Sequence, residues 1–87
     1  MDLQNYRKQI DNIDNELLQL FMERMNVARQ IALYKKEQNL PALDAARESE
    51  KLAVIDEKAG EEMRPFAHKL YELLFELSRA YQEEIIK

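Results

Sequence analysis

Residues 3–36, LQNYRKQIDNIDNELLQLFMERMNVARQIALYKK, carry the longest continuous helical pattern in the chain and decide its fold. Neither glycine nor proline interrupts them, and good helix formers occur throughout. Apolar residues recur at the heptad spacing that keeps one stripe of a helix facing a partner. We call this stripe the apolar seam: Leu3, Tyr6, Ile10, Ile13, Leu17, Leu20, Val27, Ile31 and Tyr34. The pattern predicts one long amphipathic helix.

The predicted helix is longer than a compact chain of this size. At 1.5 Å per residue its 34 residues span roughly 51 Å, whereas a compact chain of 87 residues has a diameter of about 30 Å. The overhang exposes the apolar seam unless a second chain covers it, and burial of apolar area favours the covered arrangement. We therefore expect an obligate homo-oligomer, most simply a two-fold dimer.

The composition predicts a single globular domain over residues 1–87. Hydrophobic residues make up 46% and charged residues 34%, which excludes a disordered chain. A single glycine and two prolines favour long helices with short connections over a sheet. We expect an all-α fold.

Several classes of function are disfavoured by charge and residue usage. The net charge of -4 argues against general binding to nucleic acid or to an anionic membrane. No apolar run is long enough to span a bilayer, and the first residues show no export signal. The absence of cysteine excludes thiolate chemistry and is compatible with the cytoplasmic location that we expect. Without metal-ligand spacing, we expect no metal and no cofactor.

Two further helices are expected after the long one. Asn39-Leu40-Pro41 should end the first helix, because proline disfavours helical geometry in the residue before it. Asp44 is the predicted N-cap of a short second helix, and Gly60 should end that helix in a left-handed conformation. Residues 61–64 are expected to form a linker and Pro65 to open a third helix of medium length. The buried side of this third helix should carry Phe66, Leu70, Leu73, Leu74, Leu77, Tyr81 and Ile85.

Arg24 is the one charged residue on the seam. A buried charge is costly unless it is paired or faces a ligand, so Arg24 is a structural ion pair, a register-setting residue or a ligand contact. Lys35 lies about 20° around the helix and roughly 16 Å along it, so the two cations could bracket a small anion. Arg7 is roughly 25 Å from Arg24 and could join only a partner's site in an antiparallel dimer; otherwise it is a solvated arginine.

The later segments add carboxylates and neutral polar groups. The second helix opens with Asp44, Arg47 and Glu48. These charges could contact a ligand, or they could simply interact with the partial charge at the helix end. Ser78 and Gln82 lie on the buried side of the third helix, where they could simply satisfy each other. The whole set suits a small dicarboxylate that bears a hydroxyl group. No nucleophile with a nearby general base is evident in the sequence. We therefore expect any catalysis to work by positioning and electrostatics.

These residues resemble the all-helical (type II) class of chorismate mutase over essentially the whole chain. The matching positions are Arg7, Ile10-Asp11, Ile13-Asp14, Leu17-Leu18, Arg24, Ala28, Ile31, Lys35, Pro41, Asp44, Arg47-Glu48, Ser78 and Gln82. Ala45 departs from the pattern, since many relatives have proline there. The resemblance implies an intertwined homodimer with three helices per chain. It also implies conversion of chorismate to prephenate by a Claisen rearrangement, in phenylalanine and tyrosine biosynthesis.

The resemblance also implies a role for each site residue. Arg24 and the Arg7 donated by the partner chain would bind the two substrate carboxylates, with Ser78 and Arg47 assisting. The other four residues would act on the oxygens of the ring system: Lys35 and Gln82 on the ether oxygen, where negative charge grows, and Glu48 on the ring hydroxyl, with Asp44 beside it. Arg24, Lys35, Glu48 and Gln82 are the expected catalytic residues.

Two other functions remain open. An isochorismate pyruvate lyase resembles this family in fold and in much of its site. A non-catalytic helical dimer that binds a larger shikimate-pathway enzyme is the alternative of another class, although Arg24 on the seam argues against a mere scaffold.

Overall fold

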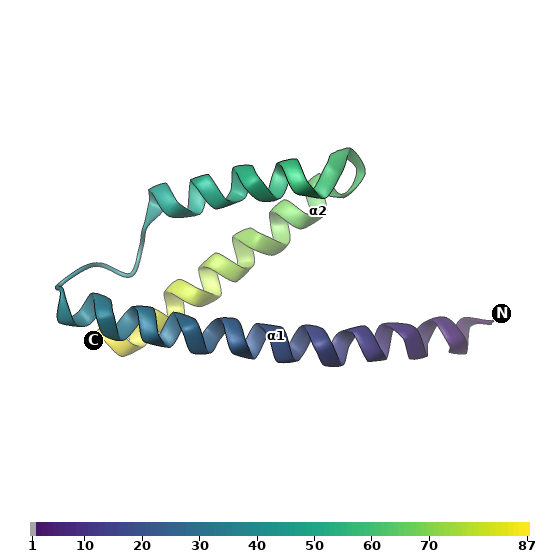
Figure 1. The fold of residues 1–87 in the computed structure, drawn as a ribbon, viewed down its shortest axis with the longest axis horizontal. Helices are drawn as coiled ribbons and strands as arrows, with labels where there is room; N and C mark the ends of the chain where they lie inside the picture. Colours follow the sequence, from purple (N-terminus) through teal and green to yellow (C-terminus); the bar gives the residue numbers. More distant parts are fainter. Residues whose placement is uncertain (1) are drawn as a thin grey trace.

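The computed structural model describes residues 2–87 and contains two helices. Helix α1 is Leu3–Glu37 and helix α2 is Ala45–Ile86, with residues 38–44 between them. Figure 1 shows α1 as a long rod and α2 as a hairpin folded against it. No strand occurs in the described residues, so the expectation of an all-α fold is confirmed.

The ends of α1 are set by local hydrogen bonds. Asp2 is the N-cap, and its Oδ1 accepts from the backbone N–H of Asn5 at 3.0 Å. At the other end Asn39 adopts a left-handed conformation with φ +57°, and the backbone N–H of Leu40 donates to the Lys35 carbonyl at 2.8 Å. The helix therefore stops where the sequence predicted that it would.

Helix α2 begins as predicted and then reverses at its glycine. Asp44 is the N-cap, with its Oδ1 accepting from the backbone N–H of Arg47 at 3.1 Å. Gly60 has φ +79° and ψ 170°, a conformation that is essentially restricted to glycine. We call residues 45–59 the first arm of α2 and residues 61–86 its second arm.

The prediction of three helices was wrong, because residues 2–87 form two helices. Residues 61–64 are helical and Pro65 lies inside α2, so no linker separates the arms. Gly60 alone turns the chain, and helical geometry resumes directly after it. Sequence reasoning had assigned that reversal to several residues.

Helix α1 sets the longest dimension of the molecule. The molecule measures 55 × 27 × 14 Å along its principal axes, and 35 helical residues span about 52 Å. In Figure 1 the first turns of α1 extend beyond the hairpin of α2, and the second arm descends to the C-terminal part of α1. Within residues 2–87, no other helix lies beside the first turns of α1, which include Arg7.

The core of the single chain is small. In residues 2–87 the buried apolar side chains are Ala28, Ala32, Ala42 and Phe75, and no large side chain is fully buried. All nine residues of the apolar seam are 43–61% exposed. Most of the residues expected on the buried side of the third helix, which correspond to the second arm, are exposed in the single chain. Phe66 is 66% exposed and Leu73 is 49% exposed. Neither helix is apolar enough over a sufficient length to cross a membrane, within the residues described.

Candidate active site

A cavity of about 600 Å³ lies between the C-terminal half of α1, the 38–44 loop and the two arms of α2. It is lined by all the predicted site residues except one: Arg24, Lys35, Asp44, Arg47, Glu48, Ser78 and Gln82. Arg7 does not line it and is exposed in the second turn of α1. The folded chain thus gathers seven of the eight predicted residues, from both helices.

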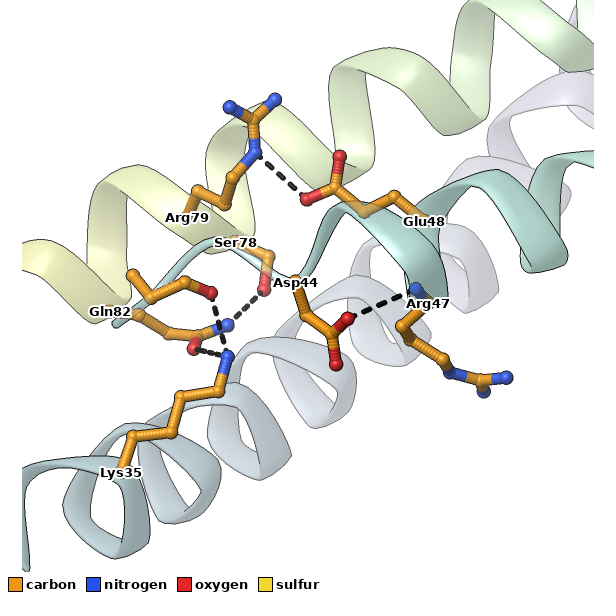
Figure 2. Close-up of polar contacts among 8 residues, drawn as sticks. Lys35, Asp44, Arg47, Glu48, Ser78, Arg79 and Gln82 are labelled. Carbon is orange, nitrogen blue, oxygen red and sulfur yellow. Dashed lines mark hydrogen bonds and ion pairs between the residues drawn. The ribbon is translucent and has the colours of Figure 1, made fainter. Parts of the chain in front are cut away.

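A chain of hydrogen bonds joins α1 to the second arm at this cavity (Figure 2). Lys35 Nζ donates to Ala42 O at 2.7 Å and to Gln82 Oε1 at 2.9 Å. Gln82 Nε2 in turn donates to Ser78 Oγ at 2.9 Å. Because an ammonium group can only donate, it fixes the amide of Gln82 with its oxygen toward Lys35 and its nitrogen toward Ser78.

These bonds leave specific donors unused. An ammonium carries three N–H groups and a primary amide carries two, so Lys35 and Gln82 each retain one. Gln82 is 6% exposed, and its two hydrogen bonds offset the cost of burying its amide. The cavity therefore holds two adjacent donors in a fixed arrangement.

Arg24 is supported by an aromatic ring. Its Cζ lies 5.7 Å from the ring centroid of Phe75, within the range of a cation–π contact. Phe75 is buried and packs edge-on against Tyr71, with ring centroids 6.2 Å apart. No carboxylate in residues 2–87 pairs with Arg24. The structural ion pair considered for this seam position is thus absent within the described chain.

Glu48 makes an ion pair that sequence reasoning missed. Arg79 Nε, from the second arm, lies 2.9 Å from Glu48 Oε2, on the first arm. The Nε atom is buried and has no partner that meets hydrogen-bond geometry, so the contact is an ion pair with an unfavourable angle. The pair joins the two arms at the edge of the cavity (Figure 2).

Sequence reasoning also missed Lys51 and Phe75, which both line the cavity. Lys51 follows Glu48 by three residues and Phe75 precedes Ser78 by three, so helical spacing places each on the same face as a predicted site residue. That spacing could have identified them. Arg79 precedes Gln82 by three residues, so the same spacing places it too on the face of a predicted site residue.

The cavity is cationic in an acidic protein. Its five cationic side chains outnumber its two carboxylates, an excess of three positive charges, whereas the whole chain carries -4. This local charge favours an anionic ligand. Residues 2–87 contain no group of three or more His, Cys, Asp or Glu side chains that could hold a metal ion. The cations and neutral donors of the cavity can position an anion and stabilise negative charge.

Comparison with known proteins shows which family the chain resembles. The chorismate mutase type II family matches residues 6–83. A chorismate mutase from Methanocaldococcus jannaschii is 31% identical over 94 residues, which cover 98% of this chain and 88% of that protein. No solved structure matches. The chain therefore belongs to the type II chorismate mutase family and is an isomerase of that family.

Proposed function

We propose that the chain converts chorismate to prephenate by an intramolecular Claisen rearrangement, in the biosynthesis of phenylalanine and tyrosine. The observation that carries this proposal is the Lys35–Gln82 pair, which keeps two unused donors side by side in a cationic cavity. The rearrangement is unimolecular, so the protein has to select the compact conformer of the substrate and stabilise a polarised transition state.

The unused N–H groups of Lys35 and Gln82 suit the ether oxygen of the substrate. Negative charge grows on this oxygen as its bond to carbon breaks, and donors already fixed in place stabilise that charge without reorganising. Ala42 O holds Lys35, and Ser78 Oγ holds the amide of Gln82. This arrangement supports a role for both residues in the transition state.

The remaining groups suit the carboxylates and the hydroxyl group. Arg24 and Arg47 supply cations for the carboxylates. Ser78 accepts from Gln82 and so retains its own proton to donate to a carboxylate. Glu48 accepts from the ring hydroxyl, with Asp44 beside it at the start of α2.

The proposal includes a two-fold homodimer in which the partner's Arg7 completes the site. Two facts support it: all of the apolar seam is exposed in the single chain, and the buried apolar core of residues 2–87 consists of three alanines and one phenylalanine. Burying the seam against a second chain would remove the largest apolar surface from water. With the long helices antiparallel, Arg7 of one chain would reach the cavity of the other.

The direct test is an assay of the purified chain with chorismate, following the loss of chorismate and the appearance of prephenate. We expect prephenate as the product. A parallel reaction with isochorismate, in which pyruvate is measured, separates this activity from that of a lyase. A folded chain that leaves chorismate unchanged would refute the proposed function.

A further inference from the structure

We infer that Arg79 is a positioning residue that holds the carboxylate of Glu48 at the cavity for the substrate hydroxyl. This inference rests on the proposed function, because it takes Glu48 as the acceptor for the ring hydroxyl. Arg79 would act through Glu48 and would not itself contact the substrate.

The first support is the geometry of the ion pair. Arg79 engages one carboxylate oxygen of Glu48, Oε2, at 2.9 Å and does so through Nε. Figure 2 shows the two terminal nitrogens of its guanidinium directed away from Glu48. Within residues 2–87 the other carboxylate oxygen, Oε1, has no polar partner. One oxygen of Glu48 is therefore held and the other is available to accept a hydrogen bond.

The second support is the mobility that an unpaired glutamate would have. Glu48 lies in the first turn of α2 and its side chain is 23% exposed, so solvent is within its reach. Ordering a free glutamate side chain costs rotamer entropy. The substrate's two carboxylates would repel the Glu48 carboxylate from the cavity, because like charges at short range oppose each other. A fixed cation at Oε2 counters both effects.

The third support is that Arg79 lies on an arm that is tied to α1. It lies one helical turn from Gln82, whose hydrogen bonds to Lys35 and Ser78 tie the second arm to α1. The side chain is 34% exposed and its Nε is buried. This tied arm therefore places a cation beside Glu48 on the first arm.

Another contact between the arms supplies a matched control. His68 Nδ1, on the second arm, lies 2.8 Å from Asp56 Oδ1, on the first arm, and neither residue lines the cavity. If Arg79 served only to tie the arms together, breaking this second contact would have the same kinetic consequence. The variant Asp56→Asn therefore separates positioning from general support of the fold.

The test is a double-mutant cycle in kcat/KM for chorismate with Arg79→Gln, Glu48→Gln and the double variant. Hydrogen bonds and ion contacts to charged groups typically contribute enough for Arg79→Gln to lower kcat/KM about tenfold. In the Glu48→Gln background the same change should cost less than about twofold, since the neutral amide no longer needs a counter-charge. Arg79→Lys, which keeps a cation beside Glu48, should retain most of the activity.

Circular dichroism and thermal unfolding accompany each variant, and Arg79→Met replaces Arg79→Gln if the latter does not fold. Asp56→Asn should leave kcat/KM unchanged. Equal losses for Arg79→Gln with and without Glu48 would overturn the inference in favour of direct substrate binding. A loss no greater than that of Asp56→Asn would also overturn it. If the chain without substitutions does not convert chorismate, the proposed function is refuted, and this inference with it.

Discussion

Lys35 is the residue whose environment bears most directly on the proposed chemistry. Its ammonium is held by one backbone carbonyl and one amide oxygen, and it retains a single N–H for a ligand. Lys36, the next residue, is exposed and does not line the candidate active site. The two lysines therefore differ in surroundings while sharing a helix and a charge.

The variant Lys35→Ala should lower kcat/KM for chorismate by about 10² to 10³, the usual effect of removing one preorganised donor to developing charge. Steady-state kinetics measures this loss, and thermal unfolding shows whether the fold persists. The matched variant Lys36→Ala should keep the activity of the unchanged chain. A near-normal rate in folded Lys35→Ala would remove Lys35 from the mechanism.

Phe75 allows a second prediction at this scale. Its ring lies under the guanidinium of Arg24, and such contacts contribute about 0.5–2 kcal/mol. Phe75→Leu should therefore raise KM for chorismate severalfold, because Arg24 loses the surface that orients it toward a carboxylate. Phe75→Tyr, which keeps an aromatic face, should have a KM close to normal. Equal KM values for the leucine and tyrosine variants would show that the ring does not position Arg24.

Sequence reasoning located single residues where periodicity marked them as unusual. Arg24 broke an apolar seam, and Gln82 lay on an apolar face, so both could be identified without a structure. The orientation of the Gln82 amide could not be predicted, because it depends on Lys35 from 47 positions away. The ion pair of Arg79 could not be predicted for the same reason, because its partner Glu48 lies on the other arm.

At the scale of elements, the reversal in α2 brings two segments of one helix together. Asp44 and the Asn39-Leu40-Pro41 sequence predicted the helix ends correctly, since capping and proline effects are local. The predicted number of helices was wrong because the sequence gives no direct measure of how sharply one glycine can turn the chain. Gly60 completes the turn by itself, and nothing lies within 4 Å of where a Cβ atom would be.

The arms of α2 also meet at a titratable contact near Gly60. The hydrogen bond from His68 to Asp56 is the main reason that the pKa of His68 is raised above 6.5, and the charges of Asp56 and Glu72 act in the same direction. A raised pKa in the folded state means that protonated His68 stabilises the fold. This contribution is fully present below about pH 6.5 and is lost as the pH rises through the folded-state pKa.

The unfolding temperature should therefore fall as the pH is raised above 6.5. His68→Gln should flatten this part of the profile, because the amide does not titrate there. Thermal unfolding followed by circular dichroism over a pH series measures both chains. An unfolding temperature that rises over this interval in the unchanged chain, or the same slope in His68→Gln, would contradict the assignment to His68.

At the scale of the whole molecule, the exposed apolar seam is the dominant feature. The 55 Å length of the molecule comes from α1, whose first turns extend beyond the hairpin of α2 (Figure 1). The sequence predicted this excess length from periodicity alone. The proposed dimer gives the long helix two tasks: its first turns supply Arg7 to the partner's cavity, and its later turns supply Arg24 and Lys35 to its own.

Mixing two inactive variants tests this account most directly. Arg7→Ala and Arg24→Ala chains are purified separately, combined in equal amounts and allowed to exchange subunits. If each site takes Arg24 from one chain and Arg7 from the other, every heterodimer regains one intact site, and random exchange should restore about a quarter of the unchanged activity by two-fold symmetry. No recovery of chorismate turnover, despite proven exchange between folded chains, would contradict the shared site.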